Sequence, residues 1–217
     1  MATVQIPKEQ RFLLRNIDWG RYRSFAQTLG EAHVRLTYDR GSLEFMTLSH
    51  AHERWSNLLG QFIEVLTEEL DMPRQSGGST TLDRPDLEQG LEPDQCYYLG
   101  NEPLVRGKDE LDLAVDPPPD LAVEVDVSRS SLNRMAIYAA LRVPEVWRFD
   151  ATALHVYHLT AGQGYIEADH SLHFPFLPLA EVEAFLRRRN QMDETSLVKS
   201  FRLWVRDQIA RGWQTPP

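Results

Sequence analysis

The sequence has 217 residues, of which 42% are hydrophobic and 25% are charged, a composition that excludes a collagen, a coiled coil and a wholly disordered chain. The 23 basic and 32 acidic residues give a formal net charge of −9, which excludes a protein that coats nucleic acid by bulk electrostatic attraction. Any contact with nucleic acid must therefore be local. At this length we expect one core domain, residues 33–178, with an N-terminal extension and short helix in 1–32 and a C-terminal helical extension in 179–217.

The cysteine and hydropathy patterns restrict the compartment. Cys96 is the single cysteine, so a disulfide framework and a thiolate zinc cluster are both excluded. Residues 1–8 lack the apolar core of a signal peptide, and no run approaches the ~20 apolar residues of a membrane span. We therefore expect a cytoplasmic protein with no membrane partner.

The first third of the chain predicts a helix, a hairpin and a long amphipathic helix. Asp18 is a suitable N-cap for a helix over 19–29. Apolar residues alternate on both sides of the turn at 39–41, which is typical of a β-hairpin. Ser49 then caps a helix that ends near Asp71 and carries apolar residues at three-to-four spacing.

The rest of the chain alternates between strands and helices. We expect a short edge strand around Thr81 and Leu82, and a helix capped by Ser130 or Ser131 that ends at Leu141. The other predicted strands are 92–99, 120–127, 145–149, 154–159 and 165–173, and the other predicted helices are 179–188 and 194–211. The strand, helix and strand between residues 120 and 149 predict a crossover unit in one sheet. The predicted fold class is therefore α/β in the broad sense, which includes mixed α+β proteins. We expect one sheet with parallel and antiparallel strands and helices on its faces.

The strand over 120–127 carries the most informative pattern. Its Leu and Val residues share one face, whereas Glu124 and Asp126 share the other. Two carboxylates on a Val-rich strand repel each other and resist burial, so something must compensate them. Mg²⁺ does so naturally, because it prefers oxygen ligands. The alternative, equally compatible with this strand alone, is the solvated outer face of an edge strand.

A second acidic position lies upstream in Glu92-Pro93-Asp94. If the two predicted strands pair, Asp94 can lie beside Glu124 and supply a second metal ligand from a rigid neighbour. On its own, the segment is also an ordinary turn signal.

Three segments together resemble the Uma-type restriction endonuclease family, a bacterial branch of the PD-(D/E)XK nuclease superfamily. They are EPD at 92–94, PDLAVEV at 119–125 and RMAIYAALRVPEVW at 134–147. The segment 41–46, followed by Ser49, His52 and Glu53, is similar to the family's hairpin and first core helix, so the likeness runs from about Leu36 to about His158. The resemblance implies a restriction-endonuclease-like fold, a central mixed sheet flanked by helices, with a metal site at its carboxylate strand pair.

The resemblance also implies roles for individual residues. Asp94 matches the aspartate of the PD motif and Glu124 the acidic residue of the (D/E)XK motif, and both would bind Mg²⁺, with Mn²⁺ as a substitute. Asp126 occupies the usual lysine position, and the basic residue is Arg134 on the following helix. Arginine cannot act as a general base, but Arg134 can hold the scissile phosphate; alternatively, it is an exposed helix arginine paired with Glu or Asp. The attacking water would then lose its proton to solvent, to the substrate phosphate or to an accessory carboxylate such as Asp126. Glu53 would complete the metal shell through water; alternatively, it stabilises the helix N-terminus.

Two other features receive ordinary interpretations. His52 can contact phosphate, but we expect a packing histidine. The basic cluster at 187–189 is typical of a solvated helix end.

The function that we expect is Mg²⁺-dependent endonucleolytic hydrolysis of DNA by a homodimer, because two sites are needed to cut both strands of a duplex. Two alternatives stay open. One is a catalytically degenerate nuclease fold that acts as a binding module, which the −9 charge, Asp126 and Arg134 favour. The other is a metal-dependent hydrolase of a small phosphorylated molecule, which an acidic protein would bind more readily than long DNA.

Overall fold

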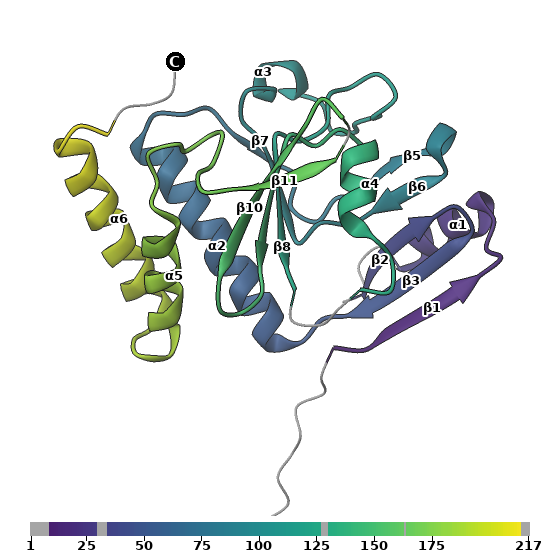
Figure 1. The fold of residues 1–217 in the computed structure, drawn as a ribbon, viewed down its shortest axis with the longest axis horizontal. Coiled ribbons are helices and arrows are strands. Elements are labelled where there is room, and N and C mark those ends of the chain that lie inside the picture. The colour runs from purple at the N-terminus through teal and green to yellow at the C-terminus, as the bar shows by residue number, and fades with distance from the viewer. Residues whose placement is uncertain (1–8, 30–33, 127–129, 163, 214–217) are drawn as a thin grey trace, which may run out of the picture.

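The computed structural model describes residues 9–29, 34–126, 130–162 and 164–213. Within these ranges the chain forms two β-sheets and six α-helices (Figure 1). The mixed α+β class is therefore confirmed. The two-sheet arrangement differs from the single central sheet expected from the sequence.

One sheet has five strands in the order β1-β3-β2-β6-β5, and the other has six in the order β11-β10-β9-β8-β7-β4. The strands are β1 (Arg11–Arg15), β2 (Val34–Asp39), β3 (Ser42–Thr47), β4 (Gln75–Ser76), β5 (Leu82–Arg84), β6 (Gln89–Leu91), β7 (Gln95–Tyr98), β8 (Leu121–Val125), β9 (Glu145–Phe149), β10 (Leu154–Leu159) and β11 (Tyr165–Ala168). The helices are α1 (Trp19–Leu29), α2 (His50–Glu69), α3 (Glu102–Val105), α4 (Arg134–Ala140), α5 (Leu179–Arg187) and α6 (Glu194–Ala210), with 3₁₀ turns η1 (Pro85–Leu87) and η2 (Arg188–Asn190).

The six-stranded sheet contains the predicted crossover. Strands β8 and β9 are parallel, with Glu124 opposite Arg148, and α4 connects them. Apolar residues of β8 pack with α2 on one face, while Ala122 packs with α4 on the other. Because Glu124 is only 8% exposed, β8 does not have the solvated outer face that was the alternative for its acidic side.

The five-stranded sheet is built around the predicted hairpin. Strands β2 and β3 pair in register, and α1 covers the face that carries Leu36, Tyr38 and Leu43. On the opposite face, Thr37 and Glu44 form a cross-strand pair, and both side chains are buried. Strand β1, which the sequence did not predict, pairs with β3 and extends this sheet.

The chain passes from one sheet to the other at Glu92, Pro93 and Asp94. The amide of Glu92 still donates to Leu36 of β2 at 3.1 Å, whereas the amide of Asp94 donates to Val123 of β8 at 3.1 Å. The prediction of one strand over 92–99 was therefore wrong at its start. Proline has no N–H to donate to a ladder, and Pro93 separates two pairings that belong to different sheets.

The start of α4 also differs from the prediction. Asn133 is the N-cap, and its side chain accepts a hydrogen bond from Ala136 at 3.1 Å. Neither Ser130 nor Ser131 caps the helix, because Glu44 engages both residues instead. The last predicted strand also ends early, at Ala168. The predicted end of the strand over 120–127 lies outside the described residues, because β8 ends at Val125 and residue 127 is not described.

Helices α5 and α6 belong to the main core. Phe201 of α6 stacks on Phe62 of α2 with ring centroids 4.2 Å apart, and Phe185 of α5 packs edge-on against Phe201. Phe62 and Phe201 have no exposed surface. The C-terminal helices therefore stabilise α2, the helix that reaches the acidic strands.

We predict that Phe201→Ala lowers the free energy of unfolding by about 3–5 kcal/mol, because it leaves a cavity between α2 and α6. Leu203→Ala, on the same helix at a side chain that is 65% exposed, should change it by less than about 0.5 kcal/mol. Urea unfolding followed by circular dichroism measures both. Equal losses in the two variants would show that α6 does not contribute to the core in this way.

Candidate active site between the two sheets

Asp94 and Glu124 are two buried carboxylates that lie close together where the chain enters β7, close enough for the Asp94 charge to act on Glu124. The Asp94 amide donates to the Val123 carbonyl of β8 at 3.1 Å, so Asp94 lies beside the strand residue that precedes Glu124. The Asp94 carboxylate accepts a hydrogen bond from the Val125 amide at 2.7 Å, which fixes its position. Asp94 and Glu124 are 3% and 8% exposed. The structure thus brings together the two residues that the sequence singled out as metal ligands.

Asp94 is supported by a buried histidine. His52 of α2 lies with Nε2 2.8 Å from Asp94 Oδ1 and Nδ1 2.7 Å from Glu9 Oε1, and its side chain is fully buried. Burial opposes a charge on the imidazole, but the two carboxylates prevail and raise the pKa of His52 to about 10. Burial would likewise raise the pKa of Asp94, but the charged His52 holds it below its usual value.

His52 is the buried, partnered histidine expected from the sequence, but the identity of its partners was not predicted. It is more than a packing histidine, because it bridges two acidic side chains. The available signal was its place on the buried stripe of α2, three residues before Trp55 and seven before Leu59. A polar residue on such a stripe requires a partner.

Glu124 takes its partners from α4. Arg134 Nη2 and the Tyr138 hydroxyl both donate to Glu124 Oε1, while Arg134 also donates to Thr37 and, at 2.8 Å, to the Glu92 carbonyl. Burial raises the pKa of Glu124, and the nearby Asp94 charge adds to this rise against the opposing effect of Arg134. Both terminal nitrogens of Arg134 are thus engaged by the protein, whereas its buried Nε has no hydrogen-bond partner among the described residues.

Tyr138 was also missed. It lies four residues after Arg134 on α4, so both side chains occupy the same helix face. That spacing was the signal in the sequence.

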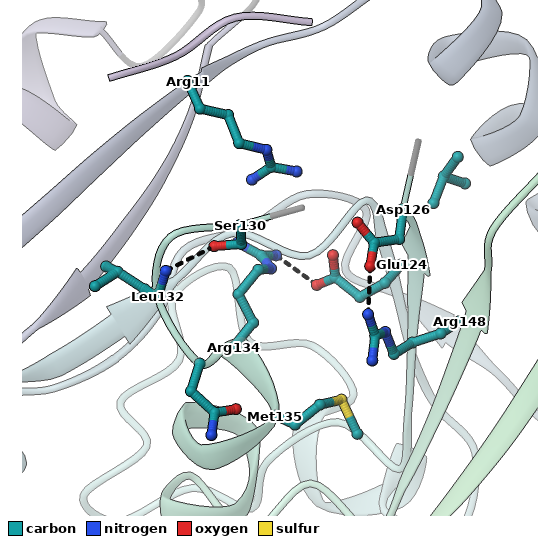
Figure 2. Close-up of a pocket in the computed structure, with 10 residues that line it drawn as sticks. Arg11, Glu124, Asp126, Ser130, Leu132, Arg134, Met135 and Arg148 are labelled. Carbon is teal, nitrogen blue, oxygen red and sulfur yellow. Dashed lines mark hydrogen bonds and ion pairs between the residues drawn. The ribbon is translucent and has the colours of Figure 1, made fainter. Parts of the chain in front are cut away.

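A cavity of about 280 Å³ opens beside Glu124 (Figure 2). The charged and hydroxyl-bearing residues in its wall are Arg11, Glu124, Asp126, Ser130, Arg134 and Arg148. Arg11 comes from the five-stranded sheet and Arg148 from the six-stranded sheet. The cavity therefore lies between the two sheets.

Asp126 and Glu53 lie in different surroundings. Asp126 lines the cavity and pairs with Arg148, whereas Glu53 occupies the first turn of α2 and does not line the cavity. Asp94 does not line it either. The structure therefore gathers Glu124, Asp126 and Arg134 at the cavity, while Asp94 lies close to Glu124 but outside the cavity wall.

Glu44 of β3 is a further buried acid that the sequence did not indicate. Its carboxylate accepts hydrogen bonds from Ser130 Oγ and the Ser131 amide, both at 2.6 Å, and from Arg11 at 2.9 Å. Burial would raise the pKa of Glu44, but these donors hold it below its usual value. Glu44 thereby ties the five-stranded sheet to the segment that leads into α4.

The donor set agrees in kind with a magnesium site. Among the described residues, no three His, Cys, Asp or Glu side chains are grouped so that they could hold a metal ion. Mg²⁺, however, often takes one or two carboxylates and completes its shell with water and substrate phosphate. Asp94 and Glu124 fit that set, provided that Arg134 gives up its hydrogen bond to Glu124.

The mixed sheet with one parallel strand pair, its crossover helix and the two neighbouring buried carboxylates agree with a restriction-endonuclease-like fold. Residues 22–190 match the model of the Uma2 family, described as "Putative restriction endonuclease". Since the match covers most of the chain, this chain belongs to that family. No curated protein matches it. The described residues contain no helix that is long and apolar enough to cross a membrane.

We predict that His52 makes stability pH-dependent in the alkaline range. Its pKa is about 10 in the folded protein and near 6.5 when unfolded, so its contribution is complete below about pH 6.5 and is lost as the pH rises towards 10. The free energy of unfolding should fall by up to about 1.4 kcal/mol per pH unit between pH 7 and 9.

Urea unfolding of wild type, His52→Gln and His50→Gln at three pH values measures this slope. His50 is exposed and lies two residues away, so it is the matched control. The slope should persist in His50→Gln and shrink in His52→Gln. An identical slope in all three proteins would rule out a charged His52.

Proposed function

We propose that the protein is a Mg²⁺-dependent endonuclease that hydrolyses DNA phosphodiester bonds, with Asp94 and Glu124 as metal ligands and Mn²⁺ as a substitute. The observation that carries this proposal is the pair of buried carboxylates, Asp94 and Glu124, that lie close together beside β8. Burial raises the pKa of Glu124, and the neighbouring Asp94 charge raises it further, because two like charges destabilise each other. A divalent cation would relieve the repulsion.

Each residue of the site has a chemical role in the hydrolysis. The oxygen of a water molecule forms a bond to phosphorus, and the bond from phosphorus to one sugar oxygen breaks. A bound Mg²⁺ would supply a Lewis acid and lower the pKa of the attacking water. Arg134 transfers its fork from Glu124 to the scissile phosphate, where it neutralises developing charge. Asp126, two residues beyond Glu124, is the accessory carboxylate that can accept the proton.

The remaining parts of the proposal concern assembly and Glu53. Two copies of the chain would supply the two sites needed to cut both strands of a duplex. Glu53, in the first turn of α2, would complete the metal shell through water.

A second candidate is a non-catalytic nucleic-acid-binding module. The observation in its favour is that both carboxylates already have protein cations as partners, His52 for Asp94 and Arg134 for Glu124. Such a protein needs no metal. Titration with a divalent cation therefore separates the two candidates.

We predict that isothermal titration with Mn²⁺ detects a site in wild type, and that Asp94→Asn and Glu124→Gln each weaken it at least tenfold, because each variant removes one of two charged ligands. Metal-dependent plasmid cleavage should disappear with it. Asp207→Asn, which removes an exposed carboxylate from α6, is the matched control and should retain the site. Unchanged Mn²⁺ affinity in both site variants would refute the ligand assignment.

We predict that Arg134→Ala lowers kcat/KM for plasmid cleavage by about 10²–10³, the range for loss of one preorganised donor. Arg134→Lys should recover part of the rate, because it restores a point charge without the planar fork. Circular dichroism checks that both variants fold, since Arg134 also anchors to Thr37 and Glu92. Full activity in the alanine variant would show that Arg134 does not contribute to catalysis.

A further inference from the structure

The cavity wall contains a cation that the proposed hydrolysis does not use. Arg148 lies on β9, directly opposite Glu124 in the parallel ladder, so its side chain is on the acidic face of the sheet. Its guanidinium pairs with Asp126 and lies 5.9 Å from the centroid of the Tyr157 ring. Its neighbours Trp147 and Phe149 point into the opposite core. The position of Arg148 is therefore fixed by the strand.

Each arginine of the cavity is paired with one carboxylate. The pairs are Arg11 with Glu44, Arg134 with Glu124, and Arg148 with Asp126. In the first two pairs, no side chain is more than 11% exposed. In the third, Arg148 is 34% and Asp126 is 23% exposed. The pairs thus differ in how much water reaches them.

This difference decides which arginine can change partners while no metal ion is bound to compensate its carboxylate. Breaking a buried pair leaves an uncompensated charge and is costly, and the cost falls as more water reaches the pair. Arg148 can therefore exchange Asp126 for an incoming anion at low cost. The planar fork of arginine matches the oxygens of a phosphate group as well as those of a carboxylate.

We propose that Arg148 binds a phosphate group of a polynucleotide backbone, next to the phosphate held by Arg134, and releases Asp126 when it does so. The ligand class rests on the proposed function. With a net charge of −9, the protein needs local cations to hold a polyanion. The cavity volume of about 280 Å³ is at the small end of ligand sites, which suits a phosphate group with part of its sugar. The exchange also frees Asp126 to act as the accessory carboxylate.

The test measures binding without cleavage. Fluorescence anisotropy of a labelled DNA oligonucleotide is followed in chelator, over a series of low salt concentrations. Arg148→Gln should weaken binding about five- to tenfold and reduce the slope of log K against log salt by about 0.7–0.9, the value of one phosphate contact. Asp126→Asn should tighten binding about two- to fivefold, because Arg148 loses its competing partner.

The exposed pair Arg211 and Asp207 on α6 supplies matched controls with the same charge changes. Arg211→Gln should leave the salt slope unchanged, and Asp207→Asn should tighten binding less than Asp126→Asn. The double variant Asp126→Asn/Arg148→Gln should bind no more tightly than Arg148→Gln. Equal effects at the two pairs would show that the change in net charge alone alters DNA binding, and would overturn the proposal.

A competition arm identifies the source of the phosphate. Inorganic phosphate and a mononucleotide should displace the oligonucleotide only at concentrations far above its own Kd. Displacement at similar concentrations would assign Arg148 to a small phosphorylated ligand and overturn the polynucleotide assignment. Neither metal binding nor cleavage enters these measurements. If the wild type does not cleave DNA but Arg148→Gln still weakens DNA binding, only the nuclease activity is refuted. If the wild type cleaves DNA but Arg148→Gln binds DNA as wild type does, only this inference is refuted.

Discussion

The site depends on two buried carboxylates that lie close together beside β8 and draw their counter-charges from two helices. His52 of α2 supports Asp94, and Arg134 of α4 supports Glu124. These helices cover opposite faces of the six-stranded sheet (Figure 1). Because an uncompensated buried charge is costly, the packing of both helices and the charge balance of the site are linked. A metal ion that binds here must take the place of a cation that the protein already supplies.

The second sheet completes this arrangement. The chain crosses between sheets at Glu92–Asp94, and the Glu92 carbonyl accepts a hydrogen bond from Arg134. Thr37 and Glu44, a cross-strand pair of the smaller sheet, hold Arg134 and the segment that precedes α4. Arg11 of β1 contacts Glu44 from outside the family match, which begins at residue 22. The N-terminal strand is thus structurally connected to the site.

Local patterns in the sequence predicted the elements whose side chains repeat with a clear period. Helices α1 and α2, the hairpin of β2 and β3, and the strand β9 all lie at or within a few residues of their predicted positions. The start of β7 and the cap of α4 were wrong, because partners distant in sequence decide both. Strand β1 gave no local signal for the same reason. At the site, Glu124 and Asp126 were predictable from alternation and Asp94 from the family resemblance. The contacts of His52 and Arg148 depend on partners that only the folded chain brings together.

The most direct test of this account is anomalous X-ray diffraction from crystals of the wild-type protein soaked in Mn²⁺. The account predicts an anomalous peak within ligand distance of one oxygen of Asp94 and one of Glu124, with the Arg134 guanidinium displaced from Glu124. An Arg134 that still donates to Glu124, with no Mn²⁺ between the two carboxylates at saturating concentration, would contradict it. In that case the buried charges would be a structural ion-pair network, and the fold would serve binding without metal-dependent hydrolysis.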